Sequence, residues 1–516
     1  MTFMERLSGI RSYTAGVWRT SILRNLICGS YLAGWLVAEG GGDTAAVYGN
    51  SLIGRFLGGF FEFFVRALQK AGNFVLPVVK ESCVLGAFAR MLKNCFPVRL
   101  LALWRELPAP VVPELYPVMG YVILDWAIRQ SPLAFLSGAW DELAFVLIVG
   151  CWLVRVMLLR IKPDFKQWLV PVALYASVMI FIAMYNAPDK VVALAGLRVM
   201  IEYIFWLFVG TNMIFSRTQL AWLIDFFILC VGLVALYGIY QYVVGVEIPA
   251  AWIDSKVETT LKTRVFSIIG SPNILGSVMV LALPVTYAMF LQAKGRLRKY
   301  LYLGAILVMG VCLVFTFSRG AWLAFIFAAI LTGLWVDKRI LLALLLLVVV
   351  SPIVLPSVAD RMSYMMSSDY QASSTKGGRI GRWSQALSYW QEHPETGVGL
   401  GRFGGAVAAQ FYPDDSFYVD SWYLKVGTES GWIGLGATLF FMITMLRKAR
   451  SALDKTESAH VKRIGFALLA GICGVLAHNL VENVFEVPMM ATYCWLFIGI
   501  ILAMPNIGKD VSNETS

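Results

Sequence analysis

The sequence predicts an all-α fold: a polytopic bundle of about 12 transmembrane helices with one large, partly helical loop outside the membrane. Of its 516 residues, 59% are hydrophobic and 15% are charged, and the mean hydropathy is +0.70. A soluble domain carries roughly 25% charged residues, so this composition favours helices that face lipid or one another. One long hydrophilic segment separates two apolar runs, from Leu355 to Gly434. We therefore expect any chemistry at the membrane surface to be assembled there.

Residues 1–113 differ from the rest of the chain, because basic side chains interrupt their short apolar runs. This pattern predicts basic amphipathic helices on the cytoplasmic membrane surface, where anionic lipid would attract them. The segment near 22–38 could span the membrane or re-enter it. The alternative is an appendage without chemistry. No cleavable signal peptide is expected, because the basic N-terminus lacks a clean apolar core and cleavage site.

Apolar windows of roughly 17–23 residues define the expected spans. Asp125 and Arg129 interrupt the first window, and Arg198 and Glu202 are spaced i,i+4 inside another, where they can pair. That pair could mark an ion path or be a neutralised structural pair. The windows lie near 115–136, 143–159, 168–185, 191–213, 220–244, 272–292, 301–317, 319–336, 339–356, 430–446, 464–480 and 487–504.

Lysine and arginine residues are concentrated in every second loop, and this bias predicts the orientation of the chain in the membrane. Basic residues gather near 160–166, 217, 294–299, 338–339 and 447–463, whereas the intervening loops are acidic or mixed. The basic loops and both termini are therefore expected in the cytoplasm of a multi-pass plasma-membrane protein. The same bias accounts for the net charge of +11 without nucleic-acid binding.

The loop at 357–429 is expected to face outward and to carry the chemistry, and the loop at 245–271 is expected to face the same side. With this orientation the chain divides into five parts. The parts are the N-terminal region 1–113, the first part of the bundle 114–356, the loop 357–429, the last part of the bundle 430–505 and a cytoplasmic tail 506–516.

Arg264 is the first outward-facing residue that could bind an anion. It precedes Ser271, Pro272 and Asn273, which open the next span, with Ser271 as a possible cap and Pro272 in the first turn. A helix N-terminus beside an arginine is suited to anions. The alternative is a turn with a snorkelling arginine.

Three further arginines are candidates. Arg319 lies at an outer hairpin, where it could meet a phosphate or cap the hairpin by bonding to carbonyl groups. Arg379 and Arg382 share a face of a predicted amphipathic helix, and two guanidinium groups on one face suit bidentate phosphate recognition. The other face would be Ile380, Trp383, Ala386, Leu387 and Trp390. The alternative is a helix face that only meets solvent.

Asp420 precedes the point where the chain returns to the bilayer. A carboxylate near a membrane surface, among arginines, can act as a general base. The alternative is a helix N-cap, for which Asp is a preferred residue. Trp383 and Trp422 could stack on sugar rings or belong to the interfacial aromatic belt.

Neither metal nor cofactor is expected. The three histidines include His393, which is predicted to end a helix before Pro394, and His478, inside a span. No His, Cys and carboxylate cluster has ligand spacing, and the eight cysteines form no CxxC, which favours buried apolar cysteines over disulfides or zinc.

Four motifs occur in a characteristic order: RVFSIIGSPNILG, FSRGAWLAF, GRIGRWSQAL with HPETGVGLGRF, and DSWYLKVGTESGWIGLG. In order and spacing, over roughly residues 260–440, they resemble the O-antigen ligase and polymerase-like membrane glycosyltransferases. The resemblance implies a GT-C-like bundle that takes a glycan from undecaprenyl diphosphate at the outer face of the plasma membrane. It implies transfer to an acceptor hydroxyl without metal or nucleotide sugar. The diphosphate-binding arginines of the family correspond to Arg264 and Arg379, with Arg382 close by, and its SRGA arginine to Arg319.

One position departs from the ligase pattern. Ligases carry a histidine eleven residues before the first glycine of the final GxxG; here Gly431 and Gly434 form the GxxG, and Asp420 takes the place of the histidine. The base would then be a carboxylate, which favours a polymerase or another acceptor class over a strict ligase. The acceptor could be a glycan, a lipid or a protein, and other envelope-assembly proteins could be partners.

Two other functions fit parts of the sequence. A multi-pass transporter for a small anion would suit the many spans and the pair of Arg198 and Glu202, although internal ionisable residues are few. A scaffold for envelope assembly would tolerate substitution of the arginines.

Overall fold

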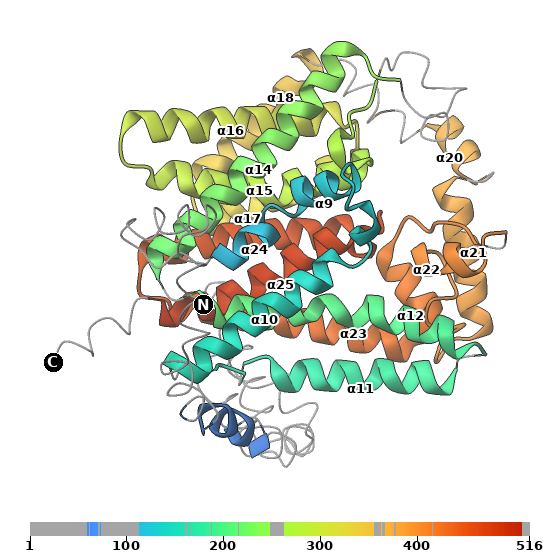
Figure 1. The fold of residues 1–516 in the computed structure, drawn as a ribbon. Helices are drawn as coiled ribbons and strands as arrows, with labels where there is room; N and C mark the ends of the chain where they lie inside the picture. The colour runs from blue at the N-terminus through green and yellow to red at the C-terminus, as the bar shows by residue number, and fades with distance from the viewer. Residues whose placement is uncertain are drawn as a thin grey trace, which may run out of the picture. The chain divides into compact units, whose positions relative to one another are not determined.

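A computed structural model describes residues 59–60, 62–70, 73 and 113–507, the last range with gaps at 160–162, 166, 187, 215, 248–262, 355–362, 364–366, 376–377 and 415. The chain divides into two units, residues 1–64 and 65–516, and everything below concerns the second. Its described residues form helices and no strands, which confirms the predicted all-α class (Figure 1). Most of the N-terminal region 1–113 lies outside the described residues, as do the last nine residues of the tail, so the predictions for both remain untested.

The first described segment of the bundle is not the single span expected near 115–136. It consists of η1 (Pro113–Leu115), α8 (Tyr116–Met119), α9 (Tyr121–Arg129) and η2 (Ala134–Leu136). The side chain of Asp125 pairs with Arg129 at 2.8 Å and accepts a hydrogen bond from the Trp140 indole at 2.9 Å. Pro132 disfavours helical geometry at the residue before it, so the helix stops.

Helices coincide with all the later windows. In the first half these are α10 (Trp140–Leu159), α11 (Leu169–Tyr185), α12 (Lys190–Ile201), η3 (Glu202–Phe205), α13 (Trp206–Asn212) and α14 (Arg217–Val244). After η5 (Ser267–Ile269) come α15 (Pro272–Gln292), α16 (Arg296–Phe315), α17 (Arg319–Trp335) and α18 (Arg339–Val354).

The predicted outer loop is partly helical. It contains α20 (Ser368–Thr375), α21 (Arg379–Glu392) and α22 (Ala406–Phe411), and the chain re-enters a long helix at α23 (Trp422–Lys455). The helix thus begins at Trp422, before the boundary expected at 429. The chain ends with α24 (Ala459–His478), η6 (Val484–Glu486), α25 (Pro488–Ala503) and η7 (Met504–Asn506).

Seven helical stretches of the described chain are long and apolar enough to cross a membrane. They support a multi-pass membrane protein, whereas the count of about 12 spans remains a prediction. They are 190–212, 217–244, 272–292, 296–315, 422–455, 459–478 and 488–506, and shorter apolar helices cover 169–185, 319–335 and 339–350.

The helices at the centre of the bundle pack closely because glycines lie at their crossings. α15 packs against α24, and a side chain at Gly471 would meet the Leu281 carbonyl oxygen at 2.6 Å. Where α13 crosses α25, a Cβ at Gly210 would lie 2.3 Å from the Leu496 carbonyl oxygen. Small residues at crossings let helices approach in membranes, where apolar burial alone does not drive association.

α23 is kinked at Gly431, and the loop after α21 fills the kink. Gly431 has φ 65° and ψ −166°, a conformation essentially restricted to glycine. A Cβ there would lie 2.2 Å from the Glu395 backbone. Backbone bonds join the two segments: Val398 donates to the Thr428 carbonyl at 2.9 Å and Trp432 to the Pro394 carbonyl at 2.9 Å. The HPETG and GxxG motifs therefore lock α21 onto α23.

Candidate functional site

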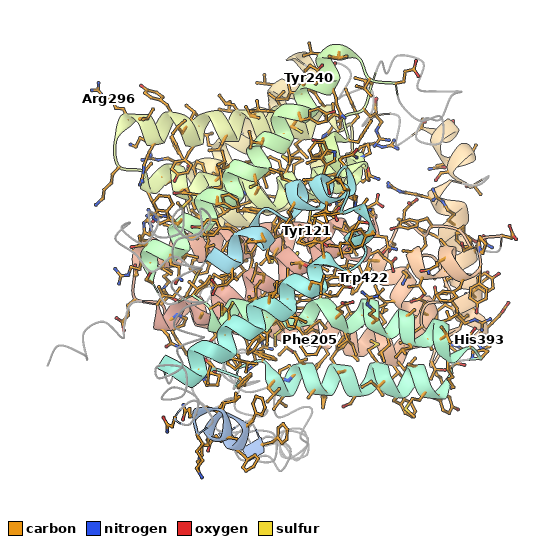
Figure 2. All side chains as sticks on the ribbon, in the orientation of Figure 1. Tyr121, Phe205, Tyr240, Arg296, His393 and Trp422 are labelled. Carbon is orange, nitrogen blue, oxygen red and sulfur yellow. The ribbon has the colours of Figure 1, made fainter. Side chains whose placement is uncertain are left out.

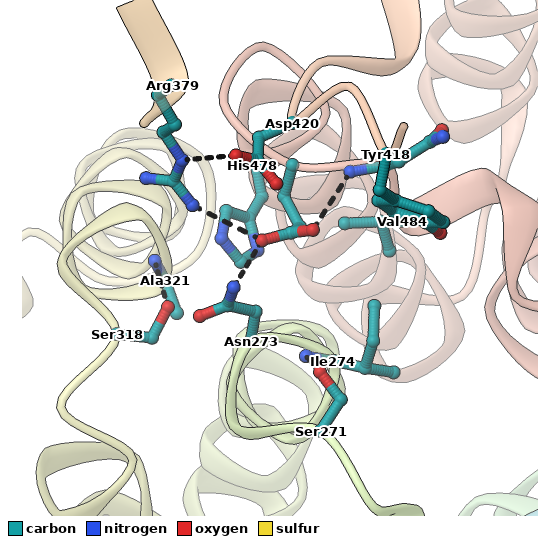
Figure 3. Close-up of polar contacts among 12 residues, drawn as sticks. Ser271, Asn273, Ile274, Ser318, Ala321, Arg379, Tyr418, Asp420, His478 and Val484 are labelled. Carbon is teal, nitrogen blue, oxygen red and sulfur yellow. Dashed lines mark hydrogen bonds and ion pairs between the residues drawn. The ribbon is translucent and has the colours of Figure 1, made fainter. Parts of the chain in front are cut away.

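The N-termini of four helices meet at one place. Three are capped by serine side chains that accept hydrogen bonds from first-turn amides: Ser271 for α15, Ser318 for α17 and Ser421 for α23. The first two caps are drawn in Figure 3. The fourth, α21, starts after Gly378 without a side-chain cap. The N-terminus of a helix carries partial positive charge and free N–H groups, so the convergence favours an anion.

Asp420 lies at the centre of this convergence and binds two arginines. One of its carboxylate oxygens is 3.3 Å from Nε of Arg379, a contact drawn in Figure 3. The same oxygen is 2.8 Å from Nη2 of Arg382. The predicted shared face of these two arginines on α21 is thereby confirmed. Ser421, rather than Asp420, caps α23, so the simple-cap alternative is wrong. The Asp420 carboxylate is thus in direct contact with both guanidinium groups.

A second carboxylate extends the network towards α15. Glu482 lies between α24 and α25, and its Oε2 is 3.4 Å from Nη2 of Arg379. The same oxygen accepts a hydrogen bond from the Asn273 amide. Nη2 of Arg264 donates to Oδ1 of Asn273 at 3.4 Å, and its Nε donates to the Thr316 carbonyl at 3.2 Å. Residues from five separate segments are thus joined in one chain of polar contacts.

Glu482 is the most enclosed charged group of this network. Its side chain is 8% exposed, against 26% for Arg379 and 31% for Arg382. Burial raises the pKa of Glu482, because the charged form loses hydration, although the charge of Arg379 acts in the opposite direction. Its signal in the sequence was faint, as a single acid at the end of a span.

Arg319 occupies the first turn of α17 and is half-buried. The next residue, Gly320, faces His478, since a Cβ there would lie 2.8 Å from Nε2 of that imidazole. Nδ1 of His478 is 2.7 Å from Oγ of Ser277 on α15. The structure therefore places the SRGA hairpin beside the network through His478, a residue that the sequence had suggested only as a buried side chain.

The two tryptophans differ in position. The indole of Trp383 donates to the Asp420 carbonyl at 3.2 Å and so borders the network. Trp422 is 5% exposed and packs edge-on against Phe485 with ring centroids 5.2 Å apart. Trp422 therefore belongs to the core beneath the site and presents no open face to a sugar.

A second charged cluster, formed by Lys425, Glu429 and Glu486, supports the site from behind. The Nζ of Lys425 lies 2.9 Å from Glu429 and 2.6 Å from Glu486, and the side chains are 2% exposed or less. The two carboxylates also accept backbone N–H groups of the loop, from Phe403 at 3.1 Å and Ala406 at 2.7 Å. A buried cluster held by these ion pairs and hydrogen bonds fixes the loop in one arrangement.

The α21 helix confirms part of its predicted pattern. Ala386 and Trp390 are buried, and the helix ends at Glu392, with His393 as its C-cap before Pro394. Ile380 and Leu387, expected on the buried face, are 39% and 47% exposed. α21 packs on α23 and on the preceding helix α20, and this packing leaves the side chains of Ile380 and Leu387 largely uncovered.

The arrangement can hold an anion with several negative charges. Arg264, Arg379 and Arg382 belong to the network, Asp420 and Glu482 are the carboxylates that it contains among the described residues, and the helix termini add partial positive charge. Among the described residues, no group of three or more His, Cys, Asp or Glu side chains is placed to hold a metal ion.

The central part of the chain is similar to a known protein family. Residues 303–439 match the family model described as O-Antigen ligase, which confirms the resemblance predicted from the motifs. This segment includes Arg319, Arg379, Arg382 and Asp420, whereas Arg264 and Glu482 lie outside it. A comparison with curated proteins gave no match. The domain supports glycan transfer of the ligase or polymerase type, with a lipid-linked glycan and an acceptor as substrates.

Proposed function

We propose that this O-antigen ligase domain transfers or polymerises a glycan carried on undecaprenyl diphosphate, at the outer face of the plasma membrane. The observation that carries the proposal is the arginine-rich network of Arg264, Arg379 and Arg382, built where four helix N-termini meet. Such a site stabilises negative charge in a setting where partial exclusion of water strengthens each interaction.

The diphosphate would bind Arg379 and Arg382, where the Asp420 carboxylate lies in the structure. Arg264, Asn273 and Arg319 border the same place and would take the second phosphate. Guanidinium groups suit this role because they present forked donors that match phosphate oxygens. Exchange of one anion for another at the arginines would release Asp420 towards the acceptor.

The reaction balances without an added redox partner. The acceptor hydroxyl oxygen forms a bond to the anomeric carbon while the bond from that carbon to the diphosphate oxygen breaks. The leaving diphosphate keeps the electron pair, and the arginines stabilise its charge. Asp420 accepts the proton of the hydroxyl group as general base. Trp383, beside Asp420, would contact the sugar. We infer that these groups act without a metal ion or cofactor.

A carboxylate in the position of the ligase histidine favours a polymerase or another acceptor class. The acceptor is then the non-reducing end of a second lipid-linked glycan, or a hydroxyl group of another lipid or of a protein.

Asp420→Asn tests the proposal. The amide keeps the shape of the side chain but cannot accept the proton, so transfer should fall by a factor of about 10²–10⁴. Binding of the lipid-linked glycan to the purified chain should persist. Transfer is measured with purified protein and undecaprenyl diphosphate-linked oligosaccharide, with and without EDTA.

Asp414→Asn is the matched control, because Asp414 lies in the same loop and is exposed. It should leave transfer unchanged. Normal glycan chains in cells that carry only Asp420→Asn would refute the proposed base. Loss of transfer on EDTA treatment would refute the metal-independent mechanism.

A further inference from the structure

A cavity of about 460 Å³ opens at the end of the bundle opposite the site. It is lined by the start of α14, the end of α15 and the start of α16, together with His460 at the start of α24. α15 and α24 both run from this cavity to the site, where Asn273 and His478 lie at their other ends. At about 1.5 Å per residue, the 21 residues of α15 separate the two places by about 31 Å, close to the thickness of the hydrocarbon core.

The cavity is basic, because its lysine and arginine side chains outnumber the carboxylates in its lining. Arg217, Lys294 and Arg298 line it, and none of them forms an ion pair or side-chain hydrogen bond with any part of the chain that the structure describes. Asp225 is the one carboxylate in the lining, and it already accepts the Tyr302 hydroxyl at 2.5 Å. Three full positive charges thus surround a single engaged carboxylate.

The surroundings of the cavity are apolar, which sets the chemical class of the ligand. Met289 and Ala221 contribute to the lining, so part of the cavity wall beside the charged groups is apolar. Next to it, Trp222 on α14 and Leu297 and Leu301 on α16 are 43%, 73% and 63% exposed, a surface suited to acyl chains. A ligand must therefore combine a negatively charged headgroup with hydrocarbon.

We propose that this cavity binds the phosphate headgroup of an anionic membrane phospholipid, with its acyl chains against α14 and α16. Basic pockets between transmembrane helices hold such headgroups, because several cations can meet one phosphate while the chains stay in the membrane. The site lies on the membrane face opposite the polar network, on the side where the positive-inside rule predicts the cytoplasm. It does not depend on the glycan-transfer proposal.

The test uses the full chain in detergent, with native mass spectrometry to count bound lipids. Phosphatidylglycerol should remain bound where phosphatidylcholine, at the same concentration, does not. Each basic residue is worth about fivefold in affinity, so Arg217→Gln/Lys294→Gln/Arg298→Gln should weaken phosphatidylglycerol binding about 100-fold.

The matched control removes the same charge from the same membrane face, outside the cavity. It is Arg296→Gln/Lys299→Gln/Lys338→Gln, three exposed residues outside the lining, of which Arg296 points away from the bundle in Figure 2. Its affinity should stay within about threefold of the original chain.

Three results would overturn the proposal: equal binding of the two lipids, equal losses in the two triple variants, or displacement of phosphatidylglycerol by equimolar inorganic phosphate. The last would assign the cavity to a small phosphate ligand. The comparison of two lipids on the unsubstituted chain needs no variant, so it remains decisive if the lining variant fails to fold. Transfer activity is not a readout of this test.

Discussion

The carboxylates of the site have different surroundings, and their roles should differ accordingly. Asp420 is held by two arginines of the loop helix, whereas Glu482 is almost fully buried and links Arg379 to Asn273. A group that accepts a proton must reach the acceptor, which favours Asp420. A buried group that bonds two residues proposed to bind the substrate is suited to holding them in position.

Glu482→Gln should therefore impair transfer through Arg379. The amide keeps the size of the side chain but loses its charge, and a hydrogen bond to a charged group is worth about 1.5–3 kcal/mol, so kcat/KM should fall about 10–100-fold. Most of the loss should appear as weaker binding of the lipid-linked glycan. Glu392→Gln, on the exposed side of α21, is the control and should be neutral. An unchanged KM would contradict the positioning role.

The same substitution has a pH signature. Burial raises the pKa of Glu482 in the folded chain, so the native state holds the proton more tightly than the unfolded state does. Ionisation then costs stability as the pH rises from the ordinary glutamate value of 4.5 towards the raised one. The melting temperature of Glu482→Gln, relative to the original chain, should increase over that pH range. A difference that stays flat with pH would contradict the raised pKa.

At the scale of elements, the local sequence pattern was sufficient to predict where some helices begin or end, but not which residues they contact. Ser271 and Pro272 predicted the start of α15, and His393 with Pro394 predicted the end of α21, because caps and prolines act within one turn. The role of Glu482 could not be predicted, since its partners are far away in the sequence. The same holds for His478.

The kink in α23 explains why two motifs of the loop occur together. Gly431→Ala should destabilise the chain by about 2–4 kcal/mol, because its backbone conformation excludes side chains and a Cβ would collide with Glu395. Gly436→Ala is the control in the same helix, since nothing lies within 4 Å of a Cβ there, and it should be neutral or slightly stabilising. The measurement is thermal unfolding of the purified chain. Equal melting temperatures for the two variants would show that the kink is dispensable.

At the scale of the whole molecule, one asymmetry organises the described bundle. α15 and α24 begin or end at the arginine network on one face and at the basic cavity on the other. Hydropathy located helices at every window after the first, because lipid demands about 20 apolar residues per crossing. It overestimated the length of the helix in the first window. There the Trp140 indole donates a hydrogen bond to the Asp125 carboxylate, and the chain forms a short helix.

This asymmetry predicts that the face with the arginine network lies outside the cell and that the face with the basic cavity lies in the cytoplasm. Single cysteines at Asp414, in the site loop, and at Lys338, on the cavity side, replace exposed charged residues and should fold normally. In intact cells a membrane-impermeant maleimide should label Asp414→Cys and not Lys338→Cys, because the positive-inside rule predicts that the basic loops stay in the cytoplasm. Permeabilised cells should label both, and the original chain gives the background from its eight native cysteines. Labelling of Lys338→Cys alone in intact cells would invert the orientation and place the arginine network in the cytoplasm, where a carrier-linked glycan at the outer face could not reach it.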